Sequence, residues 1–525
     1  MAGSVQQTLF ALDCGATNWR LYRVEYRVAE QSAEILGEPQ PASLTSFVDR
    51  KLPAVVCLNS EGTALESYGD IAQQQQEDER SRERVREYFK PCIGAYLESD
   101  PLPNQKRYTH AQALLFTKML LDAVVKQIRQ EKWRGQPFDE RALFTFSYPV
   151  HWRYGHEGKV LEDFKKIVQE CFDGSFDQIR FVPEPVGAIL SLQRGGLLSK
   201  ADGKITLIID VGGSTTDIVA GMVDPTTGSL NYIGRHGEPF GGGLYDFELA
   251  KHIADALNIP SSALADDPSA LLTLRVYGQR LKESLSRQRL HSEKSTQTPQ
   301  RMITLVMHDG TTYRRMVSLE DPKFRSLTQN LERNFAALID TALKTMSLQE
   351  ASIGQAVLVG GGAQLFTIIE HLRNRFGPDK VVLADNSEEI VVRGIGLEYG
   401  ASFGKAESTI NFPGEATGPK AEAIKPNAEA RSAWSLARAD GTLIALPPGV
   451  TTIGRGEANH IRIDDPKASR FHAELHCVGE SLELIDLGST NGTLVNARRV
   501  SPNQKLMLKA DDEIAIGQTK FICKE

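Results

Sequence analysis

One local pattern occurs twice in this chain and constrains its fold more than any other feature. In each copy an apolar strand ends in an aspartate, a glycine turn follows, and a second strand continues the chain. The first copy ends at Asp13, after a predicted strand over residues 8–13. The second ends at Asp210, after a β-branched run, and Gly212 and Gly213 make the turn. The repeat predicts a duplicated α/β fold with two similar halves.

A third glycine turn lies at residues 356–362, after another apolar run, and a helix is expected beyond it. Apolar residues recur there at spacings of three and four, which predicts one buried face: Leu365, Ile368, Ile369, Leu372 and Phe376. By contrast, the charged run at residues 77–88 is expected to form a helix that faces solvent.

Glycine turns at strand ends suit phosphate binding, because glycine has no Cβ and lets backbone N–H groups approach an anion. A magnesium ion on a phosphate chain prefers carboxylate ligands, often through water. The two aspartate-tipped turns supply both kinds of group, so two facing loops could hold a phosphate chain from opposite sides. One such loop is more often an ordinary turn than a site. Two copies and the third turn together are a far more specific signal.

The three glycine segments resemble the phosphate-1, phosphate-2 and adenosine motifs of the superfamily that contains actin, hexokinase and the heat-shock chaperones. More closely, the chain resembles the nucleotide-binding domain of the seventy-kilodalton heat-shock proteins over about residues 8–400. The further matching segments are VPEPVGA at 182–188, FGGGLYD at 240–246, LKESLS at 281–286 and NSEEIVVRG at 386–394. The resemblance implies a two-lobed, actin-like ATPase domain of mixed sheets and helices that binds ATP or ADP with Mg²⁺.

The resemblance also assigns roles to single residues. Asp13 and Asp210 are expected to hold the hydrated Mg²⁺, and Glu184 to position a water molecule. Thr17 and Thr215 are expected to contact phosphates, Thr215 nearest the γ-phosphate. The other expected nucleotide contacts are backbone N–H groups of Gly212, Gly213 and Ser214, the ribose and adenine neighbours Gly360, Gly361 and Gly362, the adenine-side residues Lys282 and Ser286, and Gly15, Ala16, Gly242 and Gly243.

Lys90 is the candidate for assisting the attack of water. In the family a lysine before an Ile-Gly pair has this role, and Lys90 in FKPCIG has the matching spacing. A cation there would offset charge that develops on the transferring phosphoryl group. The alternative, a surface lysine in a helix, stays open.

Several positions depart from the family pattern. Ala16 stands where a threonine is usual, and Glu283 and Gln364 stand where the family has arginines beside the adenine. Neither glutamate nor glutamine can stack on a base as a guanidinium does, so we expect weaker nucleotide binding. Residues 401–431 show no short apolar linker of the chaperone type, so ATP-driven clamping of unfolded peptides is not expected.

The composition changes at residues 405–433, where three prolines lie among small and charged residues, and we expect a flexible linker there. The predicted domains are therefore residues 1–404 and 434–525. The second contains short apolar strands separated by turns, a pattern typical of an all-β sandwich.

The C-terminal region resembles the forkhead-associated domain, a β-sandwich that binds phosphothreonine peptides. The matching residues are Gly454, Arg455, Ser469, Arg470, His472, Thr490, Asn491, Gly492 and Asn496. The resemblance implies a phosphopeptide site at Arg455, Ser469, Arg470, Thr490 and Asn491, because a phosphate with about two negative charges attracts guanidinium and hydroxyl donors. His472 is expected to hold the Ser469 loop. A sandwich that binds protein without phosphate is the alternative.

Composition and charge exclude some classes of protein. The net charge of -7 argues against a large nucleic-acid surface, which needs a basic excess. The six cysteines form no C-x-x-C pair, so a zinc ribbon is not expected and a reducing compartment is the simpler interpretation. Neither a signal peptide nor a membrane-spanning run is evident, which predicts a cytoplasmic protein without membrane insertion.

These observations predict an ATP-binding protein of low ATPase activity that is tethered to phosphothreonine-containing proteins, such as a Ser/Thr kinase or its substrate. The alternative is a scaffold that binds ATP in phosphorylation signalling and does not hydrolyse it. A small-molecule kinase is disfavoured by the segments at 182–188 and 386–394, and a chaperone that holds unfolded peptides is disfavoured because no peptide clamp is visible.

Overall fold

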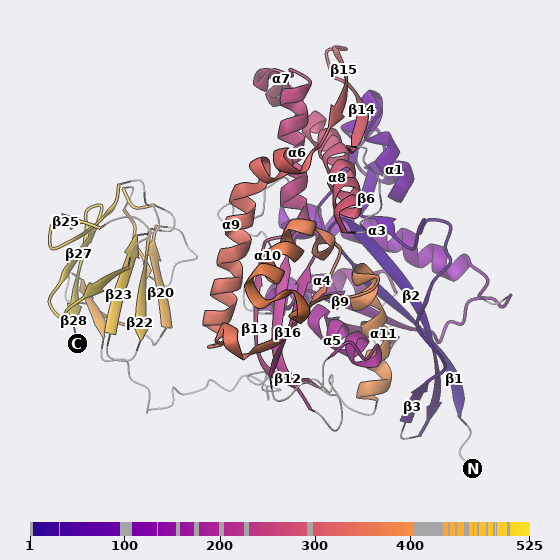
Figure 1. The fold of residues 1–525 in the computed structure, drawn as a ribbon, viewed down its shortest axis with the longest axis horizontal. Helices are drawn as coiled ribbons and strands as arrows, with labels where there is room; N and C mark the ends of the chain where they lie inside the picture. The colour runs from indigo at the N-terminus through magenta and orange to yellow at the C-terminus, as the bar shows by residue number, and fades with distance from the viewer. Residues whose placement is uncertain are drawn as a thin grey trace. The chain divides into compact units, whose positions relative to one another are not determined.

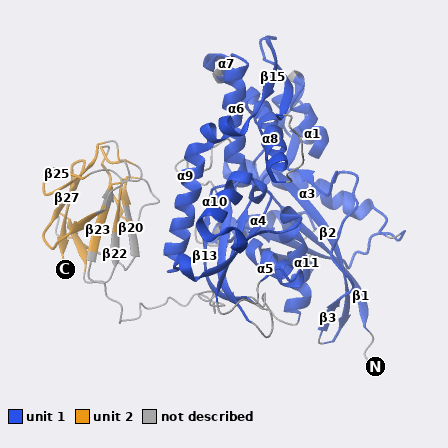
Figure 2. Cartoon of the chain, in the orientation of Figure 1, with its two compact units in different colours: residues 1–415 blue, residues 416–525 orange. Residues whose placement is uncertain are grey.

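The computed structural model contains two compact units, Met1–Glu415 and Ala416–Glu525 (Figure 2). The residues that it describes are 4–30, 32–94, 108–133, 135–153, 158–172, 178–198, 204–224, 230–290, 298–403, 434–438, 442–446, 449–455, 461–465, 467–469, 472–478, 481–486, 489, 491–500 and 505–524. The predicted linker at 405–433 lies outside the described residues.

The first sheet of the N-terminal unit has the strand order β10-β9-β1-β2-β3, with β4 and β5 also paired to β2. β1 and β2 form the predicted antiparallel hairpin, and β9 and β10 run parallel to β1 on its other side. The strands are β1 (Val5–Cys14), β2 (Asn18–Ala29), β3 (Ser32–Ile35), β4 (Gln40–Pro41), β5 (Leu52–Pro53), β9 (Leu143–Tyr148) and β10 (Ile179–Pro183).

The second sheet repeats this arrangement in the order β13-β12-β11-β16-β17. β11, β12 and β13 are antiparallel, and β16 and β17 run parallel to β11. The strands are β11 (Ile205–Val211), β12 (Thr216–Val223), β13 (Leu230–Glu238), β16 (Ile353–Val359) and β17 (Val381–Leu383). Two hairpins, each followed by two parallel strands, are the duplicated fold that the repeated motif predicts.

Helices cover both sheets (Figure 1). Those of the first half are α1 (Gly69–Gln75), α2 (Glu79–Arg82), α3 (His110–Gln130), α4 (Lys159–Glu170) and α5 (Glu184–Arg194). Those of the second half are α6 (Gly242–Ala256), α7 (Ser261–Asp266), α8 (Pro268–Leu290), α9 (Asp321–Thr345), α10 (Phe366–Phe376) and α11 (Ile390–Ser402). Short 3₁₀ turns follow at η1 (Lys90–Cys92), η2 (Val150–Arg153), η5 (Glu350–Ser352), η6 (Gly362–Gln364), η7 (Pro378–Lys380) and η8 (Ser387–Glu389). α10 is the helix predicted after the third glycine turn. It buries the expected Ile368, Ile369, Leu372 and Phe376, and Leu365 is buried directly before it.

α5 and α11 pack against each other at the centre of the N-terminal unit. A Cβ at Gly394 would lie 1.6 Å from the carbonyl oxygen of Gly187, so the two helix backbones touch where they cross. Around the crossing is one apolar cluster that both sheets share, including Leu9, Val186, Ile208, Val357 and Ile395. This common core joins the halves and fixes the hairpin β1–β2 opposite the hairpin β11–β12.

The expectation that residues 77–88 form a helix facing solvent is wrong. Only α2 is helical there, and β8 (Val85–Glu87) joins a small sheet with β6 (Val55–Leu58) and β7 (Leu65–Tyr68). Arg82 is buried and pairs with Asp267 at 2.6 Å, and its second nitrogen donates to the Val306 carbonyl at 2.7 Å. Asp267 lies between α7 and α8, and Val306 ends β14 (Gln300–Val306), which pairs with β15 (Thr312–Ser318). No local pattern could indicate these distant partners.

The C-terminal unit is all-β in its described residues, as predicted. One sheet has the order β19-β18-β28-β27-β24-β25, and the other β21-β20-β22-β23-β26. The strands are β18 (Ser435–Arg438), β19 (Leu443–Ala445), β20 (Gly449–Gly454), β21 (Ile461–Arg462), β22 (Ala473–Val478), β23 (Ser481–Asp486), β24 (Thr493–Val495), β25 (Arg498–Arg499), β26 (Lys505–Leu508), β27 (Glu513–Ile516) and β28 (Thr519–Lys524). Apolar side chains from both sheets, such as Leu436 and Leu475, form its core.

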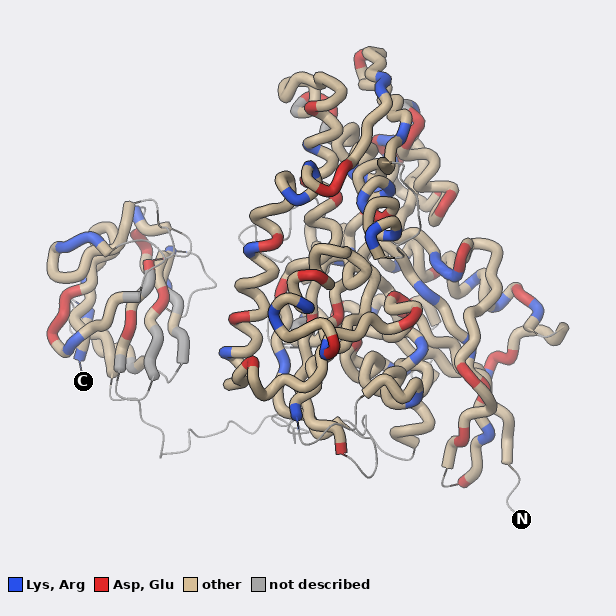
Figure 3. The backbone as a smooth tube through the Cα atoms, in the orientation of Figure 1, with Lys and Arg blue, Asp and Glu red and all other residues tan. Residues whose placement is uncertain are grey.

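Acidic and basic residues are interspersed along the described backbone (Figure 3). Among the described helices, none is long and apolar enough to cross a membrane.

Candidate nucleotide site and phosphopeptide loops

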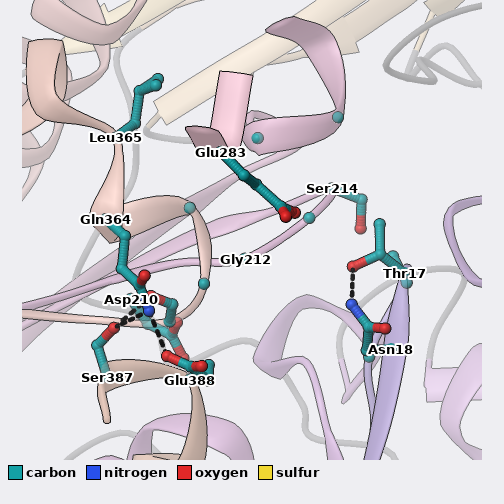
Figure 4. A pocket seen from close by; sticks show the side chains of 18 of the residues that line it. Thr17, Asn18, Asp210, Gly212, Ser214, Glu283, Gln364, Leu365, Ser387 and Glu388 are labelled. Atoms are coloured by element: carbon teal, nitrogen blue, oxygen red, sulfur yellow. Dashed lines mark hydrogen bonds between the residues drawn. The ribbon is translucent and has the colours of Figure 1, made fainter. Parts of the chain in front are cut away.

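A cavity of about 330 Å³ opens where the hairpin turns of the two sheets face each other (Figure 4). The β1–β2 turn supplies one wall and the β11–β12 turn another. Residues of η1, α5, α6, α8, η8 and the turn after β16 also line it.

Glycine allows these loops to approach backbone to backbone. A Cβ at Gly213 would lie 3.0 Å from the Thr17 methyl group, and one at Gly362 would lie 2.8 Å from the Gly212 carbonyl oxygen. Gly242 and Gly243 donate their N–H groups to the carbonyls of Gly212 and Gly213, at 3.0 and 2.8 Å. Stacked loops of this kind leave a cradle of main chain around the cavity, which suits a phosphate chain.

The third glycine turn is also fixed by backbone geometry. Gly360 has φ +86°, and a Cβ there would lie 2.3 Å from an Asp210 carboxylate oxygen. Its N–H donates to the Ser387 carbonyl at 2.9 Å. The Gln364 amide contacts Ser387 and Glu388, so its side chain is committed to the loop before α11 (Figure 4).

Charged groups from several segments surround one part of the cavity. Asp13 accepts a hydrogen bond from the Ser147 hydroxyl at 2.6 Å, which orients its carboxylate. Lys90 at the start of η1 pairs with Glu184 at the start of α5, at 2.8 Å, and both side chains are about 10% exposed. A lysine and a carboxylate from distant segments thus meet beside Asp13 and Asp210.

α8 presents a row of polar side chains to another part of the cavity wall. The Lys282 ammonium contacts Asp246 at 2.6 Å and the Gly242 carbonyl at 2.8 Å. Gln279 donates to the Glu283 carboxylate at 2.8 Å. The Ser286 hydroxyl is buried and has no hydrogen-bond partner among the described residues. Buried hydroxyl groups in proteins almost always have a hydrogen-bond partner. An unpaired hydroxyl in the cavity wall is therefore suited to a polar ligand.

In the C-terminal unit, the predicted phosphopeptide loops converge. The Arg455 N–H donates to the Ser469 carbonyl at 3.1 Å, and the Arg455 side chain is exposed. The Asn491 amide donates to the Lys467 carbonyl at 2.7 Å, which ties a third loop to the same place. Arg470 and Thr490 lie outside the described residues.

His472 holds the Ser469 loop, as predicted. It is fully buried, and its Nδ1 accepts the Ser469 N–H at 3.0 Å. Burial lowers the pKa of His472, so the neutral ring that this hydrogen bond requires is favoured. The neighbouring Asp486 accepts from the hydroxyls of Ser489 and Thr493 and so braces the next loop.

Comparison with known families agrees with both halves of this description. The family model described as Hsp70 protein matches residues 174–409, and the FHA domain model matches residues 451–517. This chain joins an Hsp70 domain to an FHA domain. The N-terminal unit therefore has the actin-like ATPase fold of Hsp70, and the C-terminal unit is the FHA β-sandwich. The Hsp70 match begins after Asp13 and Lys90, so the geometry alone relates those two residues to the cleft.

The Hsp70 domain brings every sequence-predicted cleft residue to one cavity. The lining includes Asp13, Gly15, Ala16, Thr17, Lys90, Glu184, Asp210, Gly212, Gly213, Ser214, Thr215, Gly242, Gly243, Lys282, Ser286, Gly360, Gly361 and Gly362. Their individual roles stay predictions. Lys282 is committed to Asp246 and to the Gly242 carbonyl, which shows how α8 is tied to the glycine turn at 240–243.

The electrostatics of the Hsp70 cleft fit a bound cation. Burial raises the pKa of Asp210 well above its usual value, and Glu184, Asp217 and Asp13 add to the shift. Burial and Glu184 raise the pKa of Asp217 to about 7. The nearby Lys90 ammonium opposes the Asp210 shift. A hydrated Mg²⁺ beside Asp13 and Asp210 would offset this excess negative charge. Among the described residues there is no group of three or more His, Cys, Asp or Glu side chains placed to hold a metal ion.

Sequence reasoning missed several residues of the Hsp70 cleft. Arg20 and Lys51 line the cavity near the β1–β2 turn. Asp217 is not in the lining, but it pairs with Asp210 across the β11–β12 hairpin and its pKa is raised to about 7. Arg20 could have been found, because it pairs with Asp13 across the hairpin and such pairs share a sheet face. Lys51 could not have been found, because it directly precedes the short strand β5 and belongs to no recognisable motif.

Proposed function

We propose that the Hsp70 domain binds Mg-ATP and hydrolyses it slowly, while the FHA domain tethers the protein to a threonine-phosphorylated partner in the cytoplasm. One observation carries the first half: two aspartate-tipped glycine turns face each other across a single cavity, with the Lys90–Glu184 pair beside them. Neither half of the chain could form this arrangement alone.

The proposed roles follow from chemistry and position. Mg²⁺, when bound, would neutralise charge on the phosphates, and Asp13 and Asp210 would hold its water shell. Backbone N–H groups of the Gly212–Thr215 turn face the γ-phosphate. Lys90 offsets charge on the transferring phosphoryl group, and Glu184 orients the attacking water.

Slow turnover is proposed from two features. Lys90 is already engaged with Glu184, so this cation is shared between a carboxylate and the phosphate. Glu283 places a carboxylate, in place of a stacking cation, in the wall formed by α8.

Phosphate release from purified protein tests this proposal. We expect a low but measurable rate that Lys90→Ala and Asp210→Asn each reduce by about a hundredfold, because each removes a preorganised charge. Lys118→Ala is the matched control, since Lys118 pairs with Asp122 on α3 outside the cavity. Equal rates in all four proteins would assign the activity to a contaminant.

A scaffold that binds ATP without hydrolysis is the second candidate, favoured by the same Lys90–Glu184 pair and by Glu283. Calorimetry separates the two functions. ATP binding that Asp210→Asn weakens, with no phosphate release above the buffer rate, would establish the scaffold and reject the ATPase.

For the FHA domain we propose that Arg455, Ser469 and Asn491 bind the phosphothreonine peptide, together with Arg470 and Thr490. The convergence of the Arg455, Ser469 and Asn491 loops supports this. The expected partner is a Ser/Thr kinase or a kinase substrate.

A capture experiment tests it. Arg455→Ala should lose the partners that wild type retains from a lysate, and phosphatase treatment of the lysate should have the same effect. Lys524→Ala removes a cation paired with Asp511 at the far end of β28 and should capture as wild type does. Capture that survives dephosphorylation would establish phosphate-independent binding instead.

A further inference from the structure

Tyr88 reaches from the first half of the Hsp70 domain to the turn between β11 and β12. It lies between β8 and η1, two residues before Lys90, and its side chain is buried. Its hydroxyl donates to the Gly213 carbonyl oxygen at 3.0 Å. No motif in the sequence marks this residue, and it is not part of the cavity lining.

The backbone of Tyr88 is in an unusual conformation. Its φ is +54°, the left-handed region that residues with a Cβ rarely adopt. Such a conformation persists only where surrounding contacts determine it, and it often occurs at functional sites. Here it turns the ring away from β8 and towards the β11–β12 turn.

Buried charges hold the Tyr88 ring in place. The Arg275 guanidinium of α8 lies over the ring at 5.7 Å, and the Phe247 ring meets it edge-on at 6.1 Å. Arg275 is itself fixed by two hydrogen bonds to Glu87, at 3.1 and 2.5 Å. Glu87 and Tyr88 are consecutive, so the same short segment is anchored twice in the second half.

The Gly213 carbonyl accepts two hydrogen bonds, from the Tyr88 hydroxyl and from the Gly243 N–H. This carbonyl shares a planar trans peptide with the Ser214 N–H, which therefore points the opposite way. Fixing the carbonyl on the side of Tyr88 directs the Ser214 N–H away from Tyr88, and Ser214 lines the cavity. The orientation of one peptide unit thus depends on a hydroxyl from the other half of the domain.

We propose that Tyr88 is a positioning residue for ATP hydrolysis: by holding the Gly213–Ser214 peptide, it directs the Ser214 N–H to the γ-phosphate. This rests on the proposed function of the cleft. The same segment carries Lys90 to Glu184, so Tyr88 couples the placement of the phosphate loop to the placement of the lysine. A site of this construction is complete only when both halves are in contact.

Gly243 also lies at the contact between the Tyr88 hydroxyl and the Gly213 carbonyl. A Cβ at Gly243 would lie 2.6 Å from the Tyr88 hydroxyl and 2.9 Å from the Gly213 carbonyl oxygen. Gly243→Ala should therefore displace the hydroxyl while Tyr88 itself is retained.

The test compares wild type, Tyr88→Phe, Gly243→Ala and Tyr277→Phe. Tyr277 lies on α8 and its hydroxyl contacts Glu77 at 3.3 Å, so its variant loses a tyrosine hydroxyl away from the phosphate loop. Calorimetry with Mg-ATP and Mg-ADP gives both affinities, and phosphate release gives the rate.

Tyr88→Phe and Gly243→Ala should bind ATP about fivefold to tenfold more weakly and ADP as wild type does, since only the γ-phosphate contact is disturbed. Phosphate release should fall about tenfold or more. Tyr277→Phe should match wild type in all three measurements. An equal loss of ATP and ADP affinity in Tyr88→Phe would make Tyr88 merely structural and overturn the inference.

Hydrogen exchange without nucleotide gives an independent measurement. Amides of residues 211–216 should exchange faster in Tyr88→Phe than in wild type, and unchanged exchange would also overturn the inference. If wild-type protein itself failed to bind ATP, the proposed function would fall, and the exchange data alone would still decide whether Tyr88 fixes this peptide.

Discussion

The fold determines which charged side chains face the cavity, and so how each of them affects a bound nucleotide. Glu283 places a carboxylate in the cavity wall and accepts a hydrogen bond from Gln279. A phosphate chain and a carboxylate repel each other, and in a cleft of low dielectric the repulsion is larger than in water.

Glu283→Arg should therefore tighten Mg-ATP binding, by about tenfold or more, because it removes the repulsion and adds a guanidinium able to stack on the base. Glu283→Gln should give an intermediate affinity, since it removes only the charge. Calorimetry of the three proteins measures the series. Unchanged affinity in Glu283→Arg would show that the base lies away from this part of α8.

The raised pKa of Asp217 makes the stability of the fold depend on pH, and it fixes the direction of that dependence. Its folded pKa is raised from 3.8 to about 7, so the folded protein binds this proton more tightly than the unfolded chain does. The corresponding stabilisation is present at low pH and is lost as the pH rises from about 4 to 7.

Asp217→Asn should remove this loss. Without nucleotide and with chelator present, we expect the variant to melt at a temperature higher than wild type by about 2 °C or more at pH 8, and with little difference at pH 4.5. Thermal melts at the two pH values measure this. A variant that is less stable than wild type at pH 8 would mean that the ionised carboxylate is satisfied in the fold.

Among the elements, the two hairpins could be predicted from the sequence, but the residues that pair with the charged segment at 77–88 could not. The strands at Asp13 and Asp210 follow from local apolar runs that end in a glycine turn, and α10 follows from its own spacing. The Arg82 contact joins residues 185 positions apart, so no window of sequence contains both partners. The cleft shows the same division. Its glycine motifs can be recognised in the sequence, whereas only tertiary packing places Lys51 in the cavity wall and Tyr88 against Gly213.

The buried pair of Arg82 and Asp267 should be important for stability. Both side chains are almost fully enclosed, at 1% and 4% exposure, so Arg82→Met leaves the Asp267 carboxylate without its main cation. We expect the free energy of unfolding to fall by about 3 kcal/mol or more. Arg80→Met, at an exposed position of the same α2, should change it by about 0.5 kcal/mol or less. Denaturant titrations of both variants make the comparison, and a small effect of Arg82→Met would show that the site relaxes to admit water.

At the scale of the whole molecule, the two domains have separate cores and separate sites. Within the part of the chain that the structure describes, the apolar clusters of the Hsp70 domain share no residue with the FHA core, and the cleft and the phosphopeptide loops lie in different units. The linker at 405–433 was proposed from composition, since prolines among small and charged residues cannot form a core. Fold class was predictable for both domains because each carries several motifs in a fixed order.

Limited proteolysis should therefore cut first within residues 405–433 and leave two resistant fragments, near 1–404 and 434–525. Each fragment should keep its own ligand: ATP for the first and a phosphothreonine peptide for the second. Mass spectrometry of the fragments locates the cuts. Early cleavage within either domain would contradict these boundaries.

Where α5 and α11 cross, the absence of side chains at Gly187 and Gly394 has a mechanical consequence. Interlocked side chains resist rotation, whereas two bare backbones in contact act as a pivot. A small rotation of one helix against the other would displace the distant ends of the two sheets more than it displaces the two glycines. The β1–β2 and β11–β12 turns, which carry Asp13 and Asp210, would then move apart or together.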